Sequence, residues 1–336
     1  MKYQLIAVLL LIAIIVTGQE STTLENYPAL KIAKETSLFK DDVDWNKIIP
    51  NYIKIANQST VKIKQYEYLT NALGDEHGTF RSSQNFQIIA NYTGNSQNHN
   101  PHPFDYQFHS NVINNPNATF EYKLIESNIG YLKVVGVGSQ RPMETVASEI
   151  QEAIAELQEK GVDKWIVDLR YNGGGNMNPM LTGLTALLGE GNIGGSSDRL
   201  GNELSNYVIK KGQFIDTENL VIDIDNPVQN PINDKIAILV SRYTISSGEV
   251  VAIAFKGKEN TRFFGQQSAG MTTVTGYDFI DNETIMLISK AYYRDRNNEV
   301  YTNGVDVDEV IEFDEYADFE DDKIIHESVK WLDEKS

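Results

Sequence analysis

The sequence predicts an α/β (α+β) fold in which strands alternate with helices, preceded by a smaller helical region. Two short apolar runs, Trp165–Leu169 and Lys235–Val240, are typical of strands that are buried on both faces. Segments with apolar residues three and four positions apart lie before and after these runs, as in helices that cover a sheet. The chain has 336 residues, which allows one large domain and a smaller one.

The N-terminus has the pattern of a signal peptide. Lys2 precedes an apolar run from Leu5 to Val16, which gives way to the polar residues 17–20. We expect residues 1–18 to be removed after Gly18, because the run is shorter than the ~20 residues that cross a bilayer. The chain has no cysteine for a disulfide or a lipid anchor. These features predict an exported protein, periplasmic or extracellular, with no stable membrane anchor after cleavage.

Residues 19–78 are predicted to form an N-terminal helical region. Its apolar residues recur with helical spacing, at Ile48, Ile49, Tyr52, Ile53, Ala56, Tyr66, Leu69 and Leu73. Residues 79–120 are rich in Asn, Ser, Gln and Pro and show no sustained period, which indicates a polar, loop-rich connection. The remaining residues, 121–336, are predicted to form the core domain.

The core begins with a strand over 129–135 and a helix that carries apolar residues from Val146 to Leu157 and stops at Gly161. The buried strand 165–169 follows, and then a glycine cluster. The later predicted elements are a helix over 180–188, a strand over 235–240, a helix that ends near Phe255, short strands between 263 and 310, and a helix over 323–332.

Charge and histidine content argue against two classes of ligand. The formal net charge is −18, so no basic surface is available to neutralise the phosphates of a nucleic acid. The acidic stretch 312–322 contains no glycine and does not match a calcium loop. Prolines interrupt the histidine cluster His99, His102 and His109, which removes the helical spacing of metal ligands. We expect no metal and no organic cofactor.

Ser246 is the most informative residue, because it follows the strand 235–240 and precedes a helix. Free amides at a helix N-terminus stabilise negative charge, which the tetrahedral intermediate of acyl transfer requires. Ser246 and Glu249 also match a capping box, so a purely structural role is the alternative. Ser247 could cap the helix in place of Ser246.

A glycine cluster after the strand 165–169 strengthens the catalytic interpretation. Its amides can point into the crevice at the carboxyl ends of the strands, where ligands bind in open α/β sheets. No Lys-Ser/Thr pair follows Gly173-Gly174-Gly175, and the spacing does not match a dinucleotide-binding loop.

From about Tyr122 to Asp308 the sequence resembles the C-terminal processing peptidases (tail-specific proteases) and their tricorn-core relatives. Three segments carry the likeness: Asp168-Leu169-Arg170-x-Asn172-x-Gly174-Gly175, Ser246-x-x-Glu249, and Gly304-Val305-x-x-Asp308, where Val307 replaces the family's proline. The resemblance implies a ClpP/crotonase-like core. It also implies a nucleophile at Ser246 and an oxyanion hole formed by the amides of Gly174 and Ser247.

The resemblance further implies that a histidine activates the serine. The processing branch has a lysine base after a Gly-x-x-Thr-x-Gly segment, but here Met271 follows Gly265–Gly270, and a thioether cannot take a proton. The tricorn-like branch uses a histidine in a Leu-x-Asp-x-His turn, which residues 73–77 resemble. His77 is therefore the expected general base, since an imidazole with a pKa near ~6.5 suits neutral pH.

The third member of the site stays open at this point. The tricorn-like branch has an acidic residue before its final Gly-Val, and the nearest carboxylate here is Glu299. Asp75 and Glu76 are alternatives for orienting the imidazole. The segment 81–118 is too short for the PDZ module of the processing branch, because a folded domain usually needs ~50 residues.

These observations predict an exported serine endopeptidase that cleaves peptides or unfolded protein C-terminal regions. The alternative is a catalytically inactive peptide-binding protein on the same fold, which Met271 favours. Peptides or unfolded proteins are the expected partners in either case. The sequence does not indicate an oligomeric state.

Overall fold

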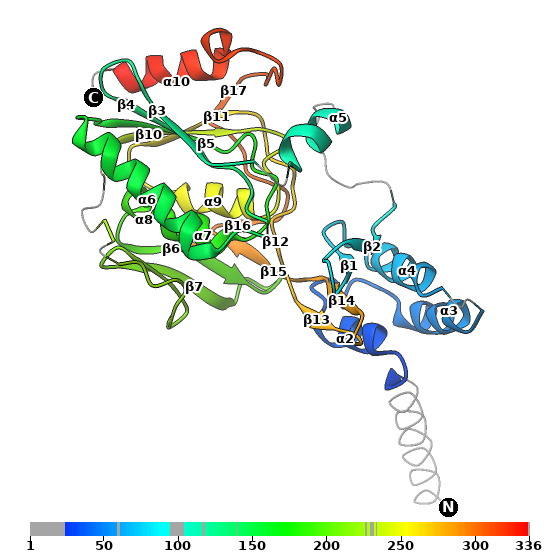
Figure 1. Ribbon diagram of the computed structural model, residues 1–336. Helices are drawn as coiled ribbons and strands as arrows, with labels where there is room; N and C mark the ends of the chain where they lie inside the picture. Colours follow the sequence, from blue (N-terminus) through cyan, green and yellow to red (C-terminus); the bar gives the residue numbers. More distant parts are fainter. Residues whose placement is uncertain are drawn as a thin grey trace, which may run out of the picture. The chain divides into compact units, whose positions relative to one another are not determined.

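The structure is a computed structural model that describes residues 24–58, 61–94, 104–115, 118–138, 140–225, 227–228, 232 and 234–334. It divides into two compact units (Figure 1). The first combines the chain up to Ser96 with Val274–Lys290, and the second comprises Gln97–Thr273 and Ala291–Ser336. The predicted signal peptide, 1–18, lies outside the described residues. Within the described ranges, no helix is both long enough and apolar enough to span a membrane.

The first unit packs helices against an antiparallel sheet. The helices are α2 (Pro28–Thr36), α3 (Trp45–Gln58) and α4 (Ile63–Leu73). The sheet has the order β13 (Asp278–Phe279), β14 (Thr284–Leu287), β1 (Thr79–Ser82) and β2 (Ile88–Asn91). Tyr66 of α4 stacks on Phe80 of β1 with ring centroids 4.1 Å apart, and Met286 of β14 joins the same core.

A mostly parallel sheet forms the centre of the second unit. Its order is β17 (Glu309–Val310), β11 (Thr261–Gly265), β10 (Lys235–Val240), β5 (Lys164–Asp168), β4 (Ile129–Lys133) and β3 (Glu121–Ile125), with only β3 antiparallel. Leu239 pairs with Asp168, so β10 and β5 end at the same edge. The segments that follow these two strands therefore leave the sheet side by side.

Helices cover both faces of this sheet, and a second sheet lies beyond one helical layer (Figure 1). The helix α10 (Lys323–Asp333) lies on one face, while α6 (Met143–Glu159), α7 (Met177–Gly183), α8 (Thr185–Leu188) and α9 (Ser247–Phe255) lie on the other. The second sheet has the order β12 (Thr273–Thr275), β15 (Ser289–Arg294), β6 (Gly191–Ser197), β7 (Glu203–Lys210), β8 (Gln213–Asp216) and β9 (Asn219–Leu220), and β16 (Val300–Tyr301) pairs with β15.

The predicted α/β fold is confirmed. The two buried strands of the sequence analysis are β5 and β10, and α6 ends before Gly161, which has a positive φ of 87°. Every residue of α9 is buried, as expected for a helix that is apolar on all sides and lies between two sheets.

Three features of the fold differ from the sequence-based expectation. Val274–Lys290, assigned to the core by sequence, belongs to the first unit, because β14 pairs with β1. The polar connection 79–120 contains β1 and β2 together with the short helices α5 (Tyr106–Phe108) and η1 (His109–Ile113). The second sheet was not predicted, because strands such as β6, with the sequence GNIGGSS, lack an apolar alternation.

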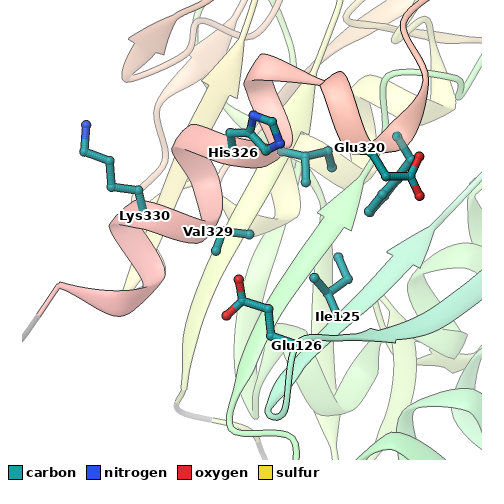
Figure 2. Close-up of a pocket in the computed structure, with 8 residues that line it drawn as sticks. Ile125, Glu126, Glu320, His326, Val329 and Lys330 are labelled. Atoms are coloured by element: carbon teal, nitrogen blue, oxygen red, sulfur yellow. The ribbon is translucent and has the colours of Figure 1, made fainter.

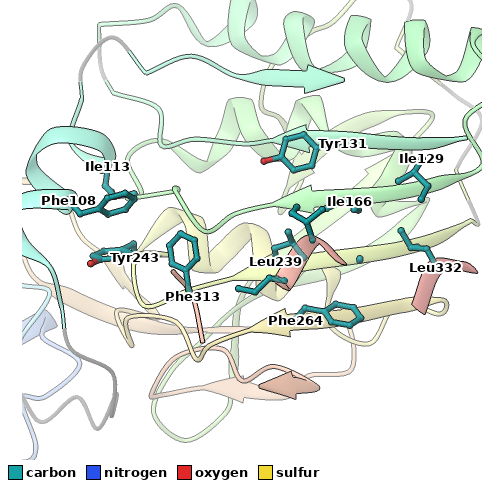
Figure 3. Packing of buried hydrophobic residues seen from close by; sticks show 13 residues of the cluster. Phe108, Ile113, Ile129, Tyr131, Ile166, Leu239, Tyr243, Phe264, Phe313 and Leu332 are labelled. Carbon is teal, nitrogen blue, oxygen red and sulfur yellow. The ribbon is translucent and has the colours of Figure 1, made fainter. Parts of the chain in front are cut away.

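The segment before β3 packs beside the loop that leads to Ser246. Figure 3 shows Phe108 and Ile113 in the same buried cluster as Tyr243 and Phe313. The rings of Phe108 and Tyr243 lie 5.0 Å apart. A Cβ on Gly173 would lie 2.4 Å from Ile113 Cγ2, so this close packing requires glycine at 173.

Candidate active site

Ser246 lies where the chain passes from β10 to α9, the placement that the sequence predicts. Its backbone angles are φ 53° and ψ −116°, a region that is costly for a residue with a Cβ. Thr244 Oγ1 donates to the Leu169 carbonyl at 2.9 Å, and the Ile245 amide donates to the Asn172 carbonyl at 2.9 Å. The surrounding structure therefore holds a polar side chain in a strained turn, an arrangement that clusters at active sites.

The glycine loop after β5 packs directly on this turn. Gly174 has a φ of 96°, and a Cβ there would lie 3.0 Å from Ser246 Cβ and 3.4 Å from the Ser247 amide nitrogen. Ser247 Oγ donates to the Gly175 carbonyl at 2.6 Å. The structure thus brings together three of the predicted site residues, Ser246, Gly174 and Ser247.

The two predicted oxyanion-hole amides differ in their surroundings. The Gly174 amide donates to Asn172 Oδ1 at 3.1 Å. An oxyanion bound there would therefore share this N–H group with Asn172 Oδ1 or displace it. Ser247 is the first residue of α9, and amides in the first turn have no acceptor within the helix. The helix N-terminus adds a partial positive charge at the same place. Asn172 was not among the predicted site residues, although it lies in the first family-like segment.

We expect Gly174→Ala to impair catalysis more than it impairs folding. The new methyl group would meet the Ile245 carbonyl at 2.9 Å and displace the Gly174 amide from the nucleophile turn. Loss of one oxyanion donor typically lowers kcat by about 100-fold or more. Gly138→Ala is a matched control, since a Cβ there meets nothing within 4 Å. Peptide hydrolysis and urea unfolding measure both effects, and an unchanged kcat in Gly174→Ala would contradict the assignment.

The carboxylate of Glu249 connects the nucleophile turn to two other segments. Its Oε2 accepts from the Ser246 amide at 2.8 Å, and its Oε1 accepts from Ser268 Oγ at 2.6 Å and from the Gly270 amide at 2.7 Å. Ser268 Oγ in turn accepts from the Val305 amide at 2.7 Å. One buried network therefore joins the nucleophile turn, the segment 265–270 and the segment that begins at Gly304.

The sequence analysis treated Glu249 as a helix cap and as part of a family-like segment, and it did not identify this network. A usable signal was present, because Glu249 is the one charged residue in the helix sequence SGEVVAIAF. A carboxylate in a fully buried helix requires hydrogen-bond donors around it. Burial raises the pKa of Glu249 to about 7, while hydrogen bonds from Ser268, Gly270, Ser246 and Met271 oppose that rise.

The raised pKa of Glu249 predicts a pH-dependent stability. Between the ordinary value of 4.5 and about 7, the folded protein holds a proton that the unfolded chain has lost. The free energy of unfolding therefore falls by about 3 kcal/mol from this group as the pH rises through that window. Glu249→Gln does not titrate, so the stability difference between the wild type and this variant should change by that amount between the two ends. Urea unfolding across the window measures it, and a constant difference would contradict the prediction.

Met271 lies beside the nucleophile turn. It follows Gly270, whose amide donates to the Glu249 carboxylate that also binds the Ser246 amide. The side chain of Met271 is half-buried. The position that carries a lysine in the processing branch is thus close to Ser246 in this chain, but it holds a thioether.

The structure does not bring Glu299 to Ser246. Glu299 is exposed, and its amide donates to Asp295 Oδ1 at 3.0 Å in the turn between β15 and β16. Its charge acts on Lys256, the residue that follows α9. Ser246 precedes the same nine-residue helix, so about 13 Å of helix separates the two ends. The sequence analysis chose Glu299 because it is the nearest carboxylate before Gly304, and it did not foresee that a turn between β15 and β16 lies at this position.

His77 belongs to the first unit, in the turn between α4 and β1, and is half-buried. Asp75 in the same turn is 1% exposed, and its carboxylate reaches Ser289 at the start of β15. Burial raises the pKa of Asp75, while hydrogen bonds from Ser289, His77 and Gly78 oppose that rise. Asp75 is therefore bonded to backbone groups of the turn that carries His77.

His109 is the described histidine of the predicted loop cluster, and aromatic rings surround it. His109 packs between Phe104 and Tyr243, with ring centroids 5.1 and 6.4 Å away, and burial lowers its pKa. His99 and His102 lie outside the described residues. In the part of the chain that the structure describes, no three His, Cys, Asp or Glu side chains are grouped as metal ligands.

A pocket of about 460 Å³ lies beside α10 (Figure 2). It is lined by Ile125, Glu126, Phe319, Glu320, Ile325, His326, Val329 and Lys330. Ile125 pairs with Ile129, the first residue of β4, at the edge where β4 and β5 begin. Ser246 and Gly174 follow the opposite ends of β10 and β5, so this pocket is separate from the candidate active site.

Two curated proteins match part of this chain. The nisin-resistance protein of Lactococcus lactis subsp. lactis is 32% identical over 153 residues, which are 44% of this chain and 46% of that protein. A carboxy-terminal processing protease of Bacillus subtilis (strain 168) is 25% identical over 211 residues, which are 60% of this chain and 39% of that protein. The chain spans less than half the length of either relative.

Two solved structures share the fold over almost the whole chain. A lipoprotein from Streptococcus agalactiae has a TM-score of 0.68 at 21% identity, covering 92% of this chain and 95% of that one. A structure from Parabacteroides merdae has a TM-score of 0.56 at 18% identity, with 91% and 95% covered.

The model of peptidase family S41 matches residues 128–311, more than half of the chain. The match contains Gly174, Ser246 and Glu249 but not His77. The chain therefore belongs to peptidase family S41.

Proposed function

We propose that the protein is an exported serine endopeptidase that cleaves peptides or unfolded protein C-terminal regions, with Ser246 as the nucleophile. The observation that carries this proposal is the strained turn of Ser246 at the start of α9, packed against Gly174. Export is supported by the signal-like pattern of Lys2 and the apolar run behind it. Membership of family S41 and the similarity to processing proteases support hydrolysis of peptide bonds.

In the proposed mechanism, His77 removes the proton of the Ser246 hydroxyl as its oxygen attacks the scissile carbonyl carbon. The amides of Gly174 and Ser247 stabilise the resulting oxyanion. The C–N bond then breaks, and the imidazolium gives its proton to the leaving amine. Water, deprotonated by His77, attacks the acyl-enzyme and releases the new carboxylate together with the free Ser246 hydroxyl. No metal or organic cofactor takes part.

The role of His77 is supported by the turn 73–77 and by the thioether at Met271, which cannot accept a proton. Glu299 is not included, because its place near Lys256 favours a surface role. In this proposal the turn of residues 73–77 orients the imidazole of His77.

The proposal is tested with a fluorophosphonate probe and a set of peptides. Treatment of the purified protein should place the phosphonyl group on Ser246, located by peptide mass mapping, and should stop peptide cleavage. Nisin belongs in the peptide set, because one relative is named for resistance to it. A protein that is not labelled at Ser246 and cleaves none of the peptides would contradict the proposal.

Met271 favours a second candidate, a peptide-binding protein without turnover. That function predicts saturable peptide binding that is unchanged in His77→Ala, with no cleavage by either protein. Calorimetry and mass spectrometry on the same samples separate the two functions.

A further inference from the structure

The turn that carries His77 is anchored at its beginning by α4. Gly74 ends this helix with a φ of 67°, and its amide donates to the Asn71 carbonyl at 3.1 Å. The Asp75 amide donates to the Thr70 carbonyl at 3.1 Å. The backbone up to Asp75 is thus a continuation of the helix end, and the Gly78 amide donates to the Asp75 carbonyl at 3.0 Å. Contacts that hold this turn against the rest of the first unit must come from side chains.

The Asp75 side chain supplies those contacts. Its Oδ2 accepts from the Ser289 amide at 2.7 Å, and its Oδ1 accepts from Ser289 Oγ at 2.7 Å. The backbone amides of His77 and Gly78 lie close enough to this carboxylate to oppose the rise of its pKa. Gly78 packs so closely that a Cβ there would lie 3.0 Å from Asp75 Cγ. One buried side chain therefore joins the turn that carries His77 to Ser289 of the same unit.

We propose that Asp75 is the positioning residue for His77, fixing its backbone and hence the direction of its imidazole without contacting the substrate. This inference rests on the proposed function. Both oxygens of the Asp75 carboxylate accept hydrogen bonds from Ser289, and the backbone of His77 and Gly78 lies beside them. Asp75 therefore differs from the aspartate of a Ser-His-Asp triad, which accepts a hydrogen bond from an N–H group of the imidazole ring itself. Positioning here acts through the main chain.

The test is a double-mutant cycle of Asp75→Asn and His77→Ala, followed by kcat and KM for peptide hydrolysis. Asn keeps the shape of Asp75 but turns an NH₂ group toward N–H donors. A misplaced base costs about 100-fold, so we expect that loss in kcat with KM changed by less than about threefold. In the His77→Ala background the same substitution should cost less than about twofold, because no base remains to be positioned.

Two further variants complete the test. Ser289→Ala removes one donor and leaves the Ser289 amide, so it should lower kcat by about tenfold and stays informative if Asp75→Asn fails to fold. Glu76→Gln, the neighbouring carboxylate, should stay within about twofold of the wild type.

Three results would overturn the inference. These are an unchanged kcat in Asp75→Asn or Ser289→Ala, an equal loss with and without His77, and a larger loss in Glu76→Gln. If His77→Ala itself retained full activity, the proposed base would be wrong and the inference would fall with it. An impaired His77→Ala with an active Asp75→Asn would overturn the inference alone.

Discussion

Replacing Ser246 by alanine is expected to lower kcat for peptide hydrolysis by about ten-thousand-fold or more, the usual effect of removing a serine nucleophile. The hydroxyl forms a bond only in the chemical step, so KM should change little. Labelling by a fluorophosphonate should disappear in the same variant. Rates of peptide cleavage and probe labelling, measured by mass spectrometry, check both expectations.

Ser110→Ala provides the control for this experiment, because Ser110 is an exposed serine in the same unit. It should leave both rates within about twofold of the wild type. If Ser246→Ala retained most of its activity, Ser246 would be a helix cap and the nucleophile would have to lie elsewhere.

His77→Ala is expected to lower kcat by about a thousandfold, within the range that a positioned general base contributes. The residual rate should match that of a serine whose proton passes to water. Peptide cleavage over a range of substrate concentrations separates this loss in kcat from any change in KM. If His77→Ala kept the kcat of the wild type, the general base would have to be another group.

Met271→Lys in the His77→Ala background sharpens that prediction. Residue 271 directly follows Gly270, which binds Glu249 beside the nucleophile turn, so a lysine there should take over as the base. We expect kcat to rise by about tenfold or more over His77→Ala alone. Met271→Leu keeps the apolar character and is the matched control, which should give no rise. An equal rise in both variants would contradict a base at this position.

Much of the core of the second unit is predictable from local sequence. β5, β10 and α6 carry long apolar patterns and a glycine stop, and each lies within a few residues of its predicted place. The position of Ser246 follows from the same information, because a parallel strand followed by a helix leaves its connecting turn at the carboxyl edge of the sheet.

Hydrogen-bond networks between side chains were harder to predict from the sequence. Glu249 looks like a helix cap in sequence, yet in the fold it binds Ser268 and Gly270. Asp75 was expected to orient His77, if at all, through the ring, whereas its carboxylate binds Ser289. These partners are far apart along the chain, and a hydrogen bond between them leaves no periodicity that a sequence can display.

The sequence by itself determined β5, β10 and α6 of the core, the turn of Ser246, the glycine loop of Gly174 and the thioether at Met271, since each depends on neighbouring residues or on side-chain chemistry. The tertiary structure alone decided that Val274–Lys290 belongs to the first unit and that Glu299 lies at the far end of α9. Such outcomes depend on which strands pair, and that choice is made by burial of the whole sheet rather than by any local pattern.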